Sequence, residues 1–157
     1  MNGLTVIDID ITGGKKRERD LISSLAYFCV DKLLPRKKNL EVNIFIKRKL
    51  QETDGLFAGV IDTDDLNTFD MDVDSSMSLR KKLLSVAHEM VHVKQFTRGE
   101  LKHTSTITAK RWRGKDYSES NYWDCPWEIE AYGRELGLFI MWVEKHNIKG
   151  KFTEDPT

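Results

Sequence analysis

The chain has 157 residues, the size of one ordinary domain. Its 25 lysines and arginines balance 25 aspartates and glutamates, which excludes a protein whose whole surface is a basic field for polyanions. The 39% hydrophobic and 32% charged residues are typical of a folded globular protein and exclude a disordered one.

Cysteine use and the apolar segments bear on the compartment. Cys29 and Cys125 lie far apart and form no CxxC pair, which argues against a disulfide framework and favours a reducing compartment. No basic-then-apolar signal region opens the chain, and its longest apolar run, Leu138–Val143, is too short to span a membrane. We therefore expect a cytoplasmic protein, or a virion-associated one if a phage encodes it, that does not enter a membrane.

The first half of the chain contains the expected strands. Apolar and polar residues alternate in Leu4–Ile11, Leu40–Lys47 and Thr68–Asp74, which predicts three strands, and a short fourth strand is expected around Gly59–Thr63. Between the first two, apolar residues recur at helical spacing over Lys15–Leu34. These segments together predict one sheet with a helix after its first strand.

Six aspartates lie between Asp62 and Asp74. An EF-hand calcium loop is rejected because neither register has a glycine at its sixth position and a glutamate at its twelfth. Three of these aspartates alternate with apolar residues along Thr68–Asp74. We therefore expect this segment to be an edge strand, with aspartates on its wet face that discourage pairing with another chain.

The second half is expected to be mainly helical. Apolar residues predict a helix over Leu79–Thr97, and Gly99 is placed to end it. The polar segment Glu100–Asp124 has no sustained period and predicts a long irregular loop. A final helix is expected over Pro126–His146, followed by a polar tail at residues 151–157.

The expected fold is a single α+β domain over residues 1–150. It has a small mixed or antiparallel sheet of three to four strands and three helices, of which the first is N-terminal, the second carries the motif described next, and the third is C-terminal.

The motif His88-Glu89-Met90-Val91-His92 lies within the helix expected over Leu79–Thr97. Four helical residues turn by about 400°, so the two imidazoles project from one face and suit two corners of a tetrahedral zinc site. Zinc lowers the pKa of its bound water to about 7, and Glu89 can accept that water's proton as the water attacks a carbonyl. The motif therefore predicts a Zn²⁺ cofactor held by His88 and His92, with Glu89 as general base.

A strand, a helix bearing HExxH and a later helix carrying a glutamate form a layout that resembles the zincin metallopeptidases of the gluzincin branch. The small size is similar to that of minimal zincin domains encoded by bacteria and their phages. The resemblance covers about residues 68–138 and implies a metallopeptidase that acts on a peptide or protein substrate. It also implies that Glu128, which aligns with the family's later glutamate, is the third zinc ligand. Tyr132 stands where the family often has an aspartate that orients a ligand histidine.

Two further residues remain candidates for the third ligand. Glu130 lies about 200° around the helix from Glu128, and His103 lies beyond the expected end of the motif helix. The longer motif HExxHxxGxxH is excluded because Gln95 and Arg98 occupy its glycine and third-histidine positions. We favour Glu128 over both alternatives.

Two other functions remain open. One is a catalytically silent zincin-fold protein, such as a virion component, in which zinc only stabilises the fold; the presence of Glu89 favours an enzyme instead. The other is a DNA-associated protease of the SprT-like kind that contacts nucleic acid through the basic cluster Lys110–Lys115. SprT-like proteins normally supply a third histidine, so the Glu128 pattern counts against this reading, and a solvated loop is the favoured explanation of the cluster.

Overall fold

The computed structural model describes residues 6–48, 57–103, 110–117 and 120–155, and the predicted α+β class is confirmed. Its main sheet has the strand order β1-β2-β4-β3. The strands are β1 (Val6–Thr12), β2 (Asn39–Lys47), β3 (Ala58–Asp62) and β4 (Thr68–Asp74). β1, β2 and β4 are parallel, and β3 pairs antiparallel with β4. The start of the first predicted strand, Leu4, lies outside the described residues.

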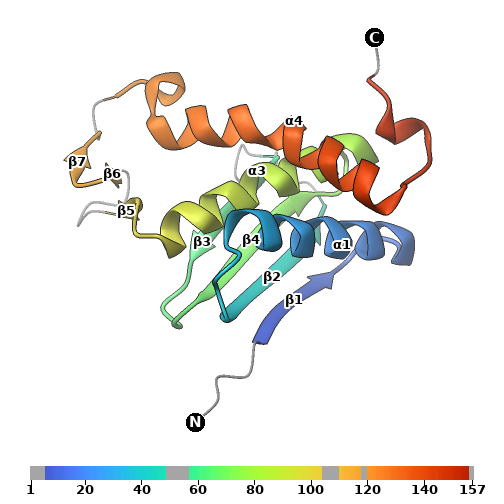
Figure 1. Cartoon of the computed structure of the whole chain (residues 1–157), viewed down its shortest axis with the longest axis horizontal. Helices are drawn as coiled ribbons and strands as arrows, with labels where there is room; N and C mark the ends of the chain where they lie inside the picture. Colours follow the sequence, from blue (N-terminus) through green and yellow to red (C-terminus); the bar gives the residue numbers. More distant parts are fainter. Residues whose placement is uncertain (1–5, 49–56, 104–109, 118–119, 156–157) are drawn as a thin grey trace.

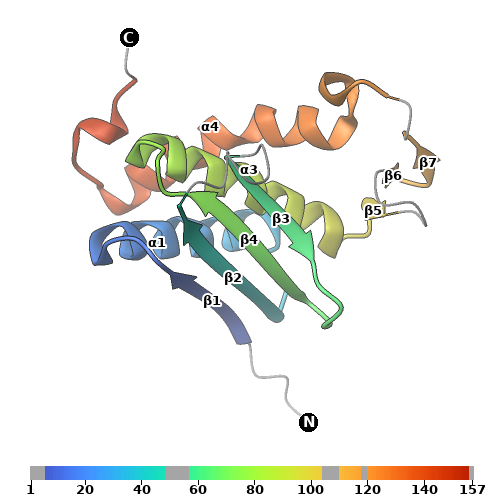
Figure 2. The same cartoon turned by 180° about the vertical axis from the view of Figure 1, so that it is seen from behind.

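Three helices lie on one face of this sheet (Figure 1). They are α1 (Lys16–Leu33), α3 (Leu79–Thr97) and α4 (Pro126–His146). α1 and α3 pack against the strands, and α4 lies along α3 on the side away from them. From the opposite side, no helix of the described residues stands in front of the sheet (Figure 2).

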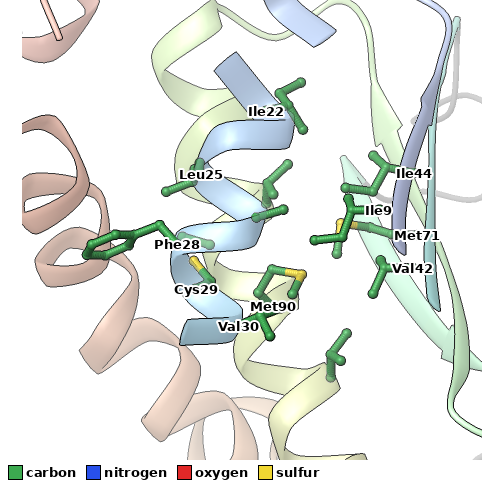
Figure 3. Close-up of a cluster of buried hydrophobic side chains, with 14 of the residues drawn as sticks. Ile9, Ile22, Leu25, Phe28, Cys29, Val30, Val42, Ile44, Met71 and Met90 are labelled. Atoms are coloured by element: carbon green, nitrogen blue, oxygen red, sulfur yellow. The ribbon is translucent and has the colours of Figure 1, made fainter. Parts of the chain in front are cut away.

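The core fills the space between the sheet and α1 and α3 (Figure 3). Alternate residues of β2 and β4 point toward the helices, and Val42, Ile44, Met71 and Val73 are completely buried. α1 and α3 supply the facing side chains. α1 contributes Ile22, Leu25 and Cys29, and α3 contributes Leu83, Ala87 and Met90. Each fully buried aliphatic side chain contributes about 1.5–3 kcal/mol, so this packing fixes the position of α3 on the sheet.

The prediction that Thr68–Asp74 is an edge strand is wrong. β4 lies between β2 and β3, so the described edge on this side is β3. Asp70 and Asp72 alternate with buried residues as expected, but on the uncovered face they have partners within the sheet. Asn43 donates a hydrogen bond to Asp70 at 3.2 Å, and Lys47 pairs with Asp72 at 3.1 Å. Asp74, which was also expected on the wet face, is instead buried. Because β3 is short and weakly patterned, the sequence signal for the pairing that makes β4 internal was weak.

The prediction of a long irregular loop after α3 is also wrong in part. Residues there form a second antiparallel sheet of β5 (Leu101–His103), β6 (Lys110–Trp112) and β7 (Lys115–Asp116). Leu101, Cys125 and Trp127 form a separate buried cluster beneath it, against which Trp112 packs. Strands of two or three residues are too short to display an alternating pattern, which is why the sequence did not reveal them.

The final residues fold back onto the domain. The predicted tail begins with a 3₁₀ helix, Lys151–Thr153, and Phe152 packs against the main core. Arg80 of α3 donates a hydrogen bond to the Phe152 carbonyl oxygen at 3.0 Å. Residues 156 and 157 of that tail lie outside the described residues. No helix in the described part of the chain is long and apolar enough to cross a membrane.

Two glycines give a matched test of this fold. Gly13 has a φ of +93°, and a Cβ there would collide with the Ile46 carbonyl oxygen. We expect Gly13→Ala to lower the free energy of unfolding by roughly 1–3 kcal/mol. Gly137 lies within α4, and a Cβ there would meet no atom within 4 Å. Gly137→Ala should therefore raise the stability by about 0.5–1 kcal/mol. Denaturant unfolding of both variants measures the two changes in the free energy of unfolding, which should have opposite signs. Equal changes would contradict the close approach described for Gly13 and Ile46.

Candidate metal centre

α3 is capped at both ends, which holds the motif in the middle of a regular helix. The Ser78 hydroxyl accepts a hydrogen bond from the Lys81 backbone N–H at 3.3 Å. At the other end Gly99, with a φ of +70°, donates to the Phe96 carbonyl, and the Glu100 N–H donates to the Gln95 carbonyl. These two bonds form a Schellman cap, as the position of Gly99 predicted.

Three side chains converge at one buried point between α3 and α4. His88 and His92 come from successive turns of α3, and Glu128 comes from the first turn of α4. Each is only 6–7% exposed, and their potential ligand atoms all lie within 4.8 Å of one another. Within the described residues, no other group of three histidine, cysteine or acidic side chains has this geometry.

The distances fit a tetrahedral metal ion. His88 Nε2 lies 3.0 Å from Glu128 Oε1, and His92 Nε2 lies 3.4 Å from Glu128 Oε2. Ligand atoms about 2.0–2.1 Å from a tetrahedral zinc ion lie about 3.3 Å from one another. Two nitrogens and a carboxylate also form the ligand set of the His₂Glu zinc sites, which leave a fourth position open.

The other ring nitrogens of both histidines have acceptors. His88 Nδ1 lies 3.1 Å from Glu135 Oε1, and His92 Nδ1 lies 2.7 Å from Gln95 Oε1. Gln95 is completely buried, and its amide nitrogen donates to the Trp127 carbonyl at 2.9 Å, which fixes its oxygen toward His92. Since a carboxylate and an amide oxygen only accept, a neutral imidazole at either position keeps its proton on Nδ1. In that neutral form, which metal binding requires, the lone pair of Nε2 is available to the metal.

Charges in the cluster reinforce this arrangement. Burial alone would lower the pKa of His88, but hydrogen bonds to Glu128 and Glu135 raise it to about 9. Burial alone would raise the pKa of Glu128, but hydrogen bonds with His88 and His92 hold it well below its usual value. An ionised Glu128 facing two imidazoles is thus the stable state, and without a metal a proton on His88 supplies the compensating positive charge.

Glu89 lies beside the ligands without belonging to them. It is buried, and burial raises its pKa, although His92 and His88 oppose this effect. It lines two hollows of about 250 and 220 Å³ that meet at the cluster. Tyr122 also lines both hollows, and its hydroxyl lies 3.3 Å from that of Tyr132. A water or a substrate carbonyl in these hollows would therefore lie beside a carboxylate and a phenol.

The two alternative ligands lie elsewhere. Glu130 accepts hydrogen bonds from Lys94 at 2.7 Å and from Gln95 at 2.9 Å, and it pairs with Arg134. It therefore supports the side chain that orients His92 and does not face the histidines. His103 stacks on Phe96, with ring centroids 5.2 Å apart, and lines one hollow without joining the ligand group.

Sequence reasoning missed both residues that orient the histidines. Glu135 follows Glu128 by seven residues, which returns it to almost the same side of α4, and that spacing was an available signal. Glu135 accepts the hydrogen bond that orients His88, a role that the family's aspartate often has at the position of Tyr132. The Tyr132 hydroxyl instead contacts the Tyr122 hydroxyl. Gln95, three residues after His92, had been noted only because it excludes the longer zinc motif.

The basic cluster Lys110–Lys115 extends over β6, a turn and the start of β7. Trp112 packs toward Trp127, with ring centroids 6.5 Å apart, and Arg113 pairs with Glu100 at 2.9 Å. Lys110 lines the smaller hollow, next to the histidines and Glu128, and Lys115 lies over the Tyr117 ring. The tryptophan is thus engaged in packing, and the segment forms short strands where a solvated loop was expected.

No family model, no curated protein and no solved structure matches the chain. What the protein does has to be inferred from the geometry of the site.

The role of Glu135 can be tested without touching a ligand. Glu135→Ala removes the acceptor of His88 Nδ1, so we expect zinc affinity to fall roughly 10- to 100-fold while the stoichiometry stays at one. Competition with a chelator of known affinity measures this change. Glu144→Ala, which removes an exposed carboxylate from the same helix, serves as the control and should leave the affinity unchanged. Equal zinc affinity in wild type and Glu135→Ala would show that this hydrogen bond does not orient His88.

Proposed function

We propose that the chain is a zinc-dependent peptidase of the zincin type, with Glu89 as general base. The observation that supports this most strongly is the convergence of two Nε2 lone pairs and one carboxylate at a buried point, with both Nδ1 atoms already engaged. A structural zinc site would be closed by a fourth protein ligand. In the described residues the cluster has three candidate ligands, and the position beside it is occupied by Glu89.

The residues of the chain divide the work as follows. His88, His92 and Glu128 would hold the metal, and zinc, when bound, lowers the pKa of a water to about 7 and polarises a carbonyl. Glu89 accepts the proton of the attacking water and delivers it to the leaving amine nitrogen. Tyr122, whose pKa burial and Tyr132 raise above its usual value, keeps its proton and can donate a hydrogen bond to the developing oxyanion.

An extended substrate would bind along the edge that β3 forms among the described strands. Ala58, Gly59 and Val60 of this strand line the smaller hollow, so this edge lies beside Glu89 and the ligands. A peptide paired with this edge through backbone hydrogen bonds would present a carbonyl to the cluster.

The proposal is tested by incubating the zinc-loaded chain with a library of mixed peptides and identifying new termini by mass spectrometry. We expect cleavage by the zinc-loaded protein and none after zinc is removed with a chelator. Zinc bound at one ion per chain with no new termini would favour a role in which the metal only stabilises the fold.

A further inference from the structure

The two hollows beside Glu89 differ in charge. The larger one, on the His88 side, is lined by Glu135 and contains no lysine or arginine among the described residues. The smaller one, on the His92 side, is lined by Lys110 and His103. Both hollows are lined by carboxylates, so the difference between them is the ammonium of Lys110, which a substrate that fills both would meet on one side of the reacting bond only.

Lys110 is positioned by the second sheet. It lies on β6, directly opposite His103 of β5, and its ammonium lies 5.6 Å from the centre of the Trp127 ring. Trp127 is itself 4% exposed, so the lysine stem rests on a fixed aromatic surface. The ammonium is thus held at the wall of the smaller hollow and does not simply extend into solvent.

Among the described residues, no carboxylate forms an ion pair with Lys110. The neighbouring cations differ in this respect, since Lys94 pairs with both Glu100 and Glu130, and Arg113 pairs with Glu100. Glu89 and Glu128 also line this hollow, so the Lys110 ammonium shares it with two carboxylates, which in the proposed function act as base and metal ligand.

Part of the wall of the smaller hollow is apolar. Val60, Phe96 and Leu101 line it, and its volume is about 220 Å³, several times the roughly 30 Å³ of one water molecule. A cavity of this size accepts one side chain next to the scissile bond. An ammonium in partly apolar surroundings attracts a carboxylate more strongly than it would in water.

We propose that Lys110, with the His103 imidazole beside it, binds a carboxylate of the substrate residue next to the scissile bond. This inference rests on the proposed peptidase function and names its substrate class, which is peptides with an acidic side chain or a free C-terminal carboxylate at that position. The selectivity comes from the β5–β6 hairpin, whereas the chemistry comes from α3 and α4.

The test uses zinc-loaded full-length protein and sets of peptides that differ only next to the cleaved bond. Each set carries Glu, Gln or Lys at that position, and each peptide is made with a free and an amidated C-terminus. Wild type, Lys110→Met and Lys110→Glu are compared, with Lys115→Glu as a control that changes an exposed charge on the same sheet. Lys110→Met keeps the alkyl stem on Trp127, which protects the fold.

We expect wild type and Lys115→Glu to prefer the carboxylate-bearing peptides. Lys110→Met should lose roughly 10- to 100-fold in kcat/KM on these peptides and change little on neutral ones, because a hydrogen bond to a charged group is lost. Lys110→Glu should reverse the preference toward Lys. A preference that persists after amidation identifies the side chain as the bound carboxylate, and one that amidation removes identifies the C-terminus.

Three results would overturn the inference. Cleavage with the same preference in wild type and Lys110→Met, or an equal loss on all peptides, removes the role of Lys110 and leaves the peptidase function standing. If wild type carries one zinc ion and cleaves no peptide of any set, the proposed function fails, and this inference fails with it.

Discussion

Glu89→Gln should bind one zinc ion per chain and fold like wild type, yet lose roughly 10²- to 10⁴-fold in kcat/KM for peptide cleavage. Glutamine has the size and shape of glutamate, so the buried position beside the ligands is filled and the metal stays in place. An amide cannot accept the proton of the attacking water, however, so the step assigned to Glu89 is lost. Steady-state cleavage rates and metal analysis on the same protein sample measure both effects.

Glu144→Gln is the matched control for this substitution, because it makes the same change at an exposed position of α4. It should retain full activity. Unchanged cleavage in Glu89→Gln would exclude this carboxylate as the base, whereas loss of zinc in Glu89→Gln would mean that Glu89 helps to hold the metal.

Glu128→Ala should lose stoichiometric zinc, and with it both activity and the rise in unfolding temperature that zinc gives wild type. The reason is that two histidines alone leave the ion with half of a tetrahedral shell and no compensating negative charge. A ligand that binds only the folded state at 100 times its Kd stabilises that state by about 2.7 kcal/mol, so removing the site removes this term. Zinc titration followed by thermal unfolding measures both quantities.

Glu130→Ala is the informative comparison, since Glu130 is two residues away on the same helix. Lys94 would keep Glu100 as a partner, and Gln95 would keep its bond to the Trp127 carbonyl. Stoichiometric zinc should therefore be retained, with at most about a tenfold loss of affinity. Zinc retained in Glu128→Ala but lost in Glu130→Ala would transfer the ligand role to Glu130. Zinc retained in both would contradict a glutamate ligand and return attention to His103.

Much of the fold could be predicted because several strands and helices bury one face and expose the other, which produces a regular pattern of apolar and polar residues. β2 and β4 alternate clearly, since one face packs on helices while the other is uncovered, and α3 has both an apolar stripe and a glycine cap. The order of strands could not be predicted in the same way. β3 carries a weak pattern, and only its pairing with β4 shows which strand forms the edge.

The candidate site likewise has a part that local sequence predicts and a part that depends on tertiary packing. The relation of His88, Glu89 and His92 follows from helix geometry alone, so it could be inferred from local sequence. The contributions of α4 depend on how two helices pack, which no local pattern specifies. The structure places Glu128 beside both histidines and Glu130 beside Lys94 and Gln95, a distinction that the sequence left open.

The central claim is that the metal bound by this cluster enables hydrolysis. The most direct test is to strip the protein of metal, add zinc in fractions of an equivalent, and follow both bound zinc and the rate of cleavage of one peptide from the library. We predict that both rise together and level off at one zinc ion per chain. Zinc binding that saturates at one equivalent without any cleavage, or cleavage that is already complete before zinc is added, would contradict the claim.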